Sequence, residues 1–305
     1  MAIASSNFQE LLEPRLRKVF FDTYDEKPEE YSGIYHVASS KKAQEHDQHV
    51  TGLGLWEKKS ESGPIKYAEI GMGDQVTYTH EEYAKGIQVP RRFVDDEMYD
   101  VIDKLPKELA RGGRALVETT AADVFNNGFT LNGYDGVPLF SDSHPLKGKD
   151  KVNPSQVGDN YLDLKFDQKG AALEEAIKLL QSQVNDNGLK IQAKADTIII
   201  PTDLEFTVLR VLNSTLQAGT SDNNTNVLKG KLKPVVLSYL TDPNAWFVAD
   251  SQLHQLWFFW RVKPEFKGEE NFDTMVAKYR GYLRFSVGYS DWRGLVGSDG
   301  TVDPE

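Results

Sequence analysis

Three adjacent residues, Asp142, Ser143 and His144, are of the types that act as orienting acid, nucleophile and base in serine hydrolases. Neighbours in sequence rarely form such a triad, because its geometry needs partners that the fold brings together from separate segments. The sequence has no Gly-x-Ser-x-Gly turn to expose the serine. Asp and Ser close to proline are ordinary turn residues. A turn is the preferred interpretation, and a soluble hydrolase is kept only as a distant alternative.

A second candidate is a pair of histidines, His46 and His49, next to Glu45 and Asp47. Histidines at this spacing could bind zinc if they lay on a helix. The surrounding segment is polar and rich in glycine, which predicts an exposed loop, and no further cluster of ligands follows. We therefore expect a solvated loop and no metal site.

A strand, a turn and a helix are predicted over residues 198–213, the order found at many phosphate-binding sites. The turn, residues 201–203, contains neither glycine nor a Lys-Ser or Lys-Thr pair, so it lacks the residues of a phosphate cradle. No cofactor is predicted. Without a convincing nucleophile, metal site or phosphate site, a structural or binding protein is favoured over an enzyme.

The composition limits the possible partners. The 305-residue chain carries 35 Lys and Arg against 46 Asp and Glu, a net charge of −11, which disfavours direct binding to nucleic acid. The absence of cysteine excludes disulfides and thiolate metal sites. No stretch approaches the ~20 apolar residues of a membrane span. The first residues lack the basic and apolar regions of a signal peptide, which indicates that the chain is made and assembled in the cytoplasm.

Two segments carry apolar side chains without an obvious partner in the chain. Residues 1–44 begin with a helical apolar stripe, Phe8, Leu11, Leu12, Leu16 and Phe20, which predicts an amphipathic arm that needs a surface to lie on, its own or a neighbour's. Residues 45–74 are polar and glycine-rich, with short apolar runs at 53–56 and 65–67 on either side of a turn signal. Because an isolated hairpin is marginal in water, we expect this two-stranded loop to project and pack on another subunit.

The remaining elements predict an α+β fold. The longest helical pattern runs from about residue 93 to 127, and Pro106 should bend it. Apolar and polar residues alternate over 275–289, which predicts a half-buried antiparallel strand with Arg280 and Arg284 on its outer face.

Three stretches suggest a family. They are Asp135-Gly-Val-Pro-Leu-Phe-Ser-Asp-Ser-His144, which is the most specific, Leu240-Thr-Asp-Pro-Asn-Ala-Trp246 and Gly288-Tyr-Ser-Asp-Trp-Arg-Gly294. The arm, the two-stranded loop at 45–74 and the long helix also follow one another in the order of that family. The chain resembles the Mu-like major head subunit family of tailed-phage capsid proteins over nearly its whole length. None of these motifs is catalytic, so the resemblance transfers no active-site residue.

The resemblance implies the Hong Kong 97-type capsid fold. Its parts would be an N-terminal arm at 1–44, an extended loop at 45–74, a peripheral domain at 75–160 and 262–305 with a spine helix at about 93–127, and an axial domain at 161–261. The chain would be a major capsid protein that self-assembles through hexamers and pentamers into an icosahedral virion shell. That shell would enclose phage DNA without sequence-specific binding.

The same resemblance implies partners. Because the arm begins within ten residues of Met1, we expect a separate scaffolding protein, with a portal during assembly and a decoration protein as an optional addition. No membrane partner is expected. The residues expected at subunit contacts are apolar side chains of the arm and loop and basic ones near the C-terminus: Phe8, Leu11, Leu12, Leu53, Leu55, Trp56, Tyr67, Arg280, Arg284 and Arg293. An encapsulin-like shell enclosing cargo enzymes shares the fold and is the main alternative.

Overall fold

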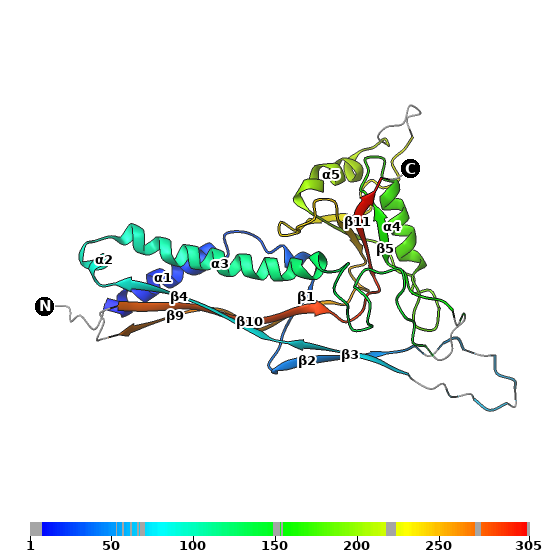
Figure 1. The fold of residues 1–305 in the computed structure, drawn as a ribbon, viewed down its shortest axis with the longest axis horizontal. Helices are drawn as coiled ribbons and strands as arrows, with labels where there is room; N and C mark the ends of the chain where they lie inside the picture. The colour runs from blue at the N-terminus through cyan, green and yellow to red at the C-terminus, as the bar shows by residue number, and fades with distance from the viewer. Residues whose placement is uncertain are drawn as a thin grey trace.

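The computed structural model describes residues 8–52, 54–56, 58–61, 63–65, 67, 71–148, 153, 155–217, 224–271 and 276–303. The molecule is elongated (Figure 1). A long helix and long strands lie side by side in one part, and a second sheet with its own helices stands at one end of them. A narrow hairpin leaves the body below that second sheet. Helices and sheets therefore form the predicted α+β arrangement.

The first sheet has four strands in the order β1-β9-β10-β4. They are β1 (His36–Ser39), β9 (Leu256–Asn271), β10 (Val276–Tyr289) and β4 (Glu81–Pro90). β10 is the predicted alternating strand and runs antiparallel to both of its neighbours. Its Tyr279 and Phe285 are buried on the face covered by helices, whereas Arg280 is exposed on the opposite face.

The long helix predicted at about 93–127 is α3 (Tyr99–Asn126), preceded by a single turn, α2 (Arg92–Asp95). The sequence predicts a bend at Pro106, and in the structure α3 runs through this proline as one helix of 28 residues. Its inner face buries Ile102, Val117 and Phe125 against the sheet and the neighbouring loops. This packing outweighs the low helix propensity of proline.

The N-terminal segment departs from its prediction. It forms α1 (Phe8–Tyr24), which lies beside α3 (Figure 1). Leu12, Leu16 and Phe20 are buried within the subunit, in one cluster with Ile102 of α3 and Phe266 of β9. The expectation of an arm without a partner in its own chain is therefore wrong for the described part. The amphipathic stripe was identified correctly, but periodicity cannot say which surface a stripe packs on.

The second sheet has five strands in the order β5-β11-β8-β6-β7. They are β5 (Tyr161–Leu164), β11 (Leu295–Val302), β8 (Trp246–Ala249), β6 (Thr197–Ile200) and β7 (Lys233–Val236). The helices α4 (Ala171–Ser182) and α5 (Glu205–Asn213) pack on it through a separate apolar cluster. Two 3₁₀ turns, η2 (Tyr31–Gly33) and η3 (Thr202–Leu204), complete the described elements.

The C-terminal strand corrects one predicted boundary. Residues 262–305 were assigned together to the part that holds the long helix, but β11 lies between β5 and β8 of the second sheet. The chain turns between the two sheets at Gly294, whose φ of 80° is rare for residues with a side chain. A Cβ there would lie 2.7 Å from the backbone nitrogen of His254. A turn that only glycine fits therefore carries the chain from one core to the other.

The projecting hairpin consists of β2 (Gln44–Val50) and β3 (Met72–Thr79), paired antiparallel with Gln44 opposite Thr79. Its paired part therefore lies at the base of the predicted loop. The described residues of the apolar runs 53–56 and 65–67 belong to no strand, and Leu53 lies outside the described residues.

Candidate subunit interface

The hairpin is held to the body by a cluster of charged side chains. His49, near the end of β2, has its Nε2 2.6 Å from a carboxylate oxygen of Asp186 and its Nδ1 3.7 Å from one of Asp291. The guanidinium of Arg293 donates hydrogen bonds at 3.0 Å to both of these carboxylates. Residues from three distant parts of the chain thus form one network, which we call the loop anchor.

The electrostatics of the loop anchor favour its charged form. The hydrogen bond to Asp186 raises the pKa of His49, and the charge of Asp291 adds to this, although partial burial lowers it. Burial alone would raise the pKa of Asp186, but the hydrogen bond from His49 and the charge of Arg293 hold it well below its usual range. Asp186 is therefore ionised at any physiological pH, and His49 is the member whose charge changes, with its pKa raised above the ordinary value.

This predicts that the attachment of the loop weakens as the pH rises. Because the folded-state pKa of His49 lies above the ordinary value of 6.5, its contribution is complete below about 6.5 and is lost as the pH rises through the raised pKa. Replacing His49 by Gln should cost about 1–2 kcal/mol of local opening free energy at pH 6. The cost should be smaller at pH 9, because a neutral imidazole keeps at most a hydrogen bond to Asp186 and loses the charge attraction.

Hydrogen exchange of the Thr51 amide measures this opening. Comparing the wild type with the His49→Gln variant at the same pH cancels the intrinsic exchange rate. A cost that is the same at pH 6 and pH 9 would contradict the charged pairing of His49 with Asp186.

Two further contacts hold the neck of the loop. Lys147 forms an ion pair with Asp74 of β3, and the side-chain amide of Asn187 donates to the carbonyl of Gly52. At the same level the Thr51 N–H donates to the carbonyl of Gly71 at 3.0 Å, which joins the two sides of the neck. The loop beyond Gly52 therefore leaves the body from a fixed point.

Beyond the neck, the described apolar side chains of the loop face solvent. Trp56 is 98% exposed, Tyr67 91%, Leu55 74% and Ile65 64%. As predicted, Trp56 does not pack on its own core. Large apolar side chains that are exposed to solvent in one segment indicate a contact with another molecule.

The other residues predicted at contacts differ in their surroundings. Leu12, only 6% exposed, and Arg293, 7% exposed, are buried in their own subunit, so neither is available to touch a neighbour as predicted. Arg280 is exposed on β10. Arg284 is half-buried, and its Nε donates to the carbonyl of His80 at 3.2 Å. The side chains of Phe8 and Leu11 lie outside the described residues.

The possible catalytic trio forms a structural joint. His144 is buried, with Nδ1 2.6 Å from a carboxylate oxygen of Asp135 and Nε2 3.1 Å from the amide oxygen of Asn160. Its ring stacks on Trp292 with the centroids 4.4 Å apart. Both ring nitrogens thus have partners other than Ser143. The joint brings together the two motifs at 135–144 and 288–294, which are separated by about half the chain.

The histidines considered as a metal pair are also engaged elsewhere. His46 Nδ1 lies 2.9 Å from Thr77 Oγ1 across the hairpin, and His49 belongs to the loop anchor. In the described part of the chain, no three His, Cys, Asp or Glu side chains are grouped so that they could hold a metal ion. Over the same residues, no helix combines the length and apolar character needed to cross a membrane.

The loop anchor was not predicted from the sequence. His49 was noticed for its spacing from His46, but its actual partner is 137 residues further along the chain. Lys147 lies in an irregular loop and Asn187 in a turn, and neither has a distinguishing local pattern. Only the resemblance pointed toward this region, because Asp291 and Arg293 belong to the motif at 288–294.

Solved structures with a similar fold come from protein shells. A chain of Microbacterium phage Oxtober96 matches with a TM-score of 0.54 and 11% identity, over 91% of this chain and 92% of that one. A chain of the procapsid of bacteriophage JBD30 matches with a TM-score of 0.51 and 16% identity, over 95% and 74%. A chain of a virus-like particle from Pyrococcus furiosus gives 0.56 and 11%, over 93% and 98%. No curated protein matches the sequence.

An elongated α+β subunit with a projecting, solvent-exposed apolar loop therefore shares its fold with chains from phages and from a virus-like particle. Residues 73–298 match the family model described as phage capsid protein, and the chain belongs to that family. The prediction of a tailed-phage major capsid protein with the Hong Kong 97-type fold is thereby confirmed. Its place is the capsid of the virion.

Proposed function

We propose that copies of this chain assemble through hexamers and pentamers into a closed icosahedral shell that encloses phage DNA. The observation that carries this proposal is the projecting loop, whose Trp56 and Tyr67 are 98% and 91% exposed in the isolated subunit. A subunit with one projecting apolar element makes heterologous contacts, in which the element of one copy binds a different surface on the next. Such contacts form a closed ring when the rotation from copy to copy adds up to a full turn. Many such contacts give a stable shell without any cysteine.

The two sheets correspond to the two domains expected of a capsid subunit. We assign the first sheet with α1 and α3 to the peripheral domain, and the second sheet with α4 and α5 to the axial domain. β11 then belongs to the axial domain. With a net charge of −11, the shell encloses DNA without recognising its sequence. Assembly takes place in the host cytoplasm with a separate scaffolding protein and a portal, and a decoration protein is an optional partner.

Electron microscopy of the purified protein, expressed alone and with its scaffolding protein, tests the proposal directly. We expect rings and closed shells, and shells recovered from infected cells should contain DNA. Shells that hold a cargo enzyme in place of DNA would favour the encapsulin-like alternative. A monodisperse monomer at high concentration, under every salt and scaffold condition, would contradict assembly altogether.

The proposal also predicts the effect of removing the loop tryptophan. Trp56→Ala should leave the unfolding of the isolated subunit unchanged, because the side chain is almost fully exposed there. It should weaken each contact between subunits by about 2 kcal/mol, the usual loss for an aromatic anchor at an interface. The check is to compare the melting of assembled shells with that of dissociated subunits. A shell that melts at the wild-type temperature would show that Trp56 is not an anchor.

A further inference from the structure

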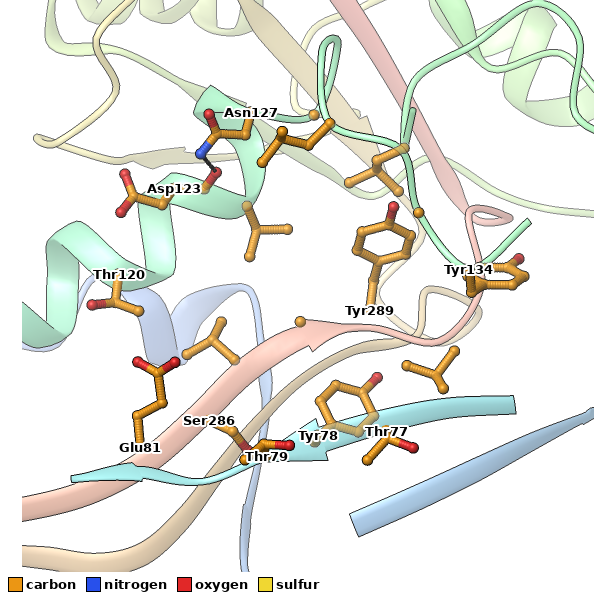
Figure 2. Close-up of a pocket in the computed structure, with 18 of the residues that line it drawn as sticks. Thr77, Tyr78, Thr79, Glu81, Thr120, Asp123, Asn127, Tyr134, Ser286 and Tyr289 are labelled. Carbon is orange, nitrogen blue, oxygen red and sulfur yellow. Dashed lines mark hydrogen bonds between the residues drawn. The ribbon is translucent and has the colours of Figure 1, made fainter. Parts of the chain in front are cut away.

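A cavity of about 470 Å³ lies between the C-terminal half of α3 and the strands β3 and β10 (Figure 2). Its walls come from three segments: the end of β3 with the start of β4, the last turns of α3 with the loop to residue 134, and the end of β10. In Figure 2, Thr120 and Asp123 of α3 and Asn127, which follows its last residue, lie above, and Tyr78 and Thr79 of β3 lie below. The cavity therefore separates the helical layer from the sheet.

The lining is mainly apolar and aromatic. Tyr289 projects into the space between helix and sheet, with Tyr78 beneath it and Tyr134 at one end (Figure 2). The hydroxyl of Tyr78 is 2.6 Å from Ser290 Oγ, and that of Tyr134 donates to Asp291 at 3.3 Å. Because these polar tips already have partners, the rings present mostly carbon surface to the cavity. Such a site suits another flat aromatic side chain.

Two carboxylates stand at the open side of the cavity. Glu81 and Asp123 both line it and both are exposed. Glu81 accepts a hydrogen bond from the Tyr83 hydroxyl at 2.6 Å. No cation among the described residues lies within ion-pair distance of either carboxylate. A partner that brings one aromatic ring together with a nearby ammonium group would match this site in shape and in charge.

The loop of this chain carries that combination. Trp56 is almost fully exposed, and Lys58 and Lys59 follow it, exposed as well. In an extended segment residues two apart point to the same side, so Trp56 and Lys58 can enter one site together. The described part of the subunit does not cover this ring, because Trp56 is 98% exposed.

We propose that the cavity between α3, β3 and β10 receives Trp56 of a second copy of this chain, while Lys58 of that copy pairs with Glu81 or Asp123. The inference rests on the proposed assembly into rings and shells, and it names the receiving site. The contact is heterologous, since the loop of each copy occupies the cavity of the next. The ring loses its exposure to water, and the two rim carboxylates gain a cation.

Chemical cross-linking tests this pairing cleanly, because the chain contains no cysteine. One chain carries Lys58→Cys and a second carries Asp123→Cys, and the two are mixed before assembly and treated with a short bismaleimide. The matched control replaces Asp100, an exposed aspartate of the same helix, which is 23 residues and therefore about 35 Å away along α3. Peptide mass spectrometry identifies which residues are joined.

We expect at least tenfold more cross-linked pairs for Asp123→Cys than for Asp100→Cys in assembled shells. Equal yields in shells of normal appearance would overturn the docking site and leave the assembly proposal intact. A mixture that forms no shells, when the unmodified chain also forms none, would overturn both proposals. The wild-type chain serves as the reference for assembly in each case.

A second variant fills the cavity from within. Thr120→Trp places an indole on the half-buried face of α3 that lines the site, where the neighbour's ring should lie. It should lower the melting temperature of shells as Trp56→Ala does, without lowering that of the subunit. The double variant should be no worse than either single one, because both remove the same contact. Fully additive losses would show that the two residues act at different places and would overturn the proposal.

Discussion

Arg293→Met will lower the free energy of unfolding of the isolated subunit by about 3–5 kcal/mol, the usual cost of removing one partner from a buried ion pair. Arg293 is 7% exposed and donates to Asp186, to Asp291 and to the carbonyl of Val184. Methionine fills a similar volume but leaves His49 as the one charged partner of both carboxylates within the loop anchor, 2.6 Å from Asp186 and 3.7 Å from Asp291. Denaturant titration of dissociated subunits measures the loss.

The matched control is Arg280→Met, because Arg280 is exposed on β10. Exposed substitutions of this kind stay within about 0.5 kcal/mol of the wild type. If Arg293→Met does not accumulate as folded protein, Arg293→Lys keeps the charge but loses the two-pronged geometry and should give an intermediate loss. Equal stability of the Arg293 and Arg280 variants would mean that the loop anchor does not hold the fold together.

Phe20→Ala will lower the free energy of unfolding of the subunit by about 3–5 kcal/mol, as for other buried phenylalanines. Phe20 is buried in the cluster that joins α1 to α3 and β9. Its ring lies 5.1 Å from that of Phe266 and 5.2 Å from that of Phe21. Truncation leaves a cavity that three elements of secondary structure would have to close.

Lys18→Ala on the exposed side of the same helix is the control, and it should change stability by less than about 0.5 kcal/mol. Thermal unfolding of dissociated subunits compares the two. This result would separate a core helix from a detachable arm. If Phe20→Ala melts like Lys18→Ala while its shells fail to form, the helix contributes to assembly and not to the fold.

Much of the candidate interface could be predicted from the sequence. The glycine-rich polar segment at 45–74 indicated a projecting loop, because such a segment cannot cover its own apolar residues, and Trp56 is exposed there. Arg293 was predicted to lie at a contact between subunits, but it is buried inside its own subunit. Its charge suggested a surface contact, whereas two carboxylates from the 186 and 291 positions make its burial favourable. A sequence does not show such compensation between distant charges.

The cavity that we propose as the receiving site had no signature in the sequence. Its walls come from three separate segments, and each wall residue has an ordinary local explanation as part of a strand, a helix or a turn. Thr120 and Asp123 follow the helical period, and Tyr289 follows the alternation of β10. The hollow exists only because these elements diverge where the chain leaves α3.

The sequence alone determined the class of fold, the long helix, the alternating strand at 275–289 and the family, because helical and strand periodicities and short motifs are local properties. The tertiary structure decided which surface each stripe covers. It placed α1 on its own subunit, inserted β11 into the second sheet, and joined His49 to Asp186 across 137 residues. The reason is physical. An apolar stripe or a charged side chain is stable in a folded protein only with a partner, but the local sequence does not say which one. Only the packed chain brings one particular partner within contact distance.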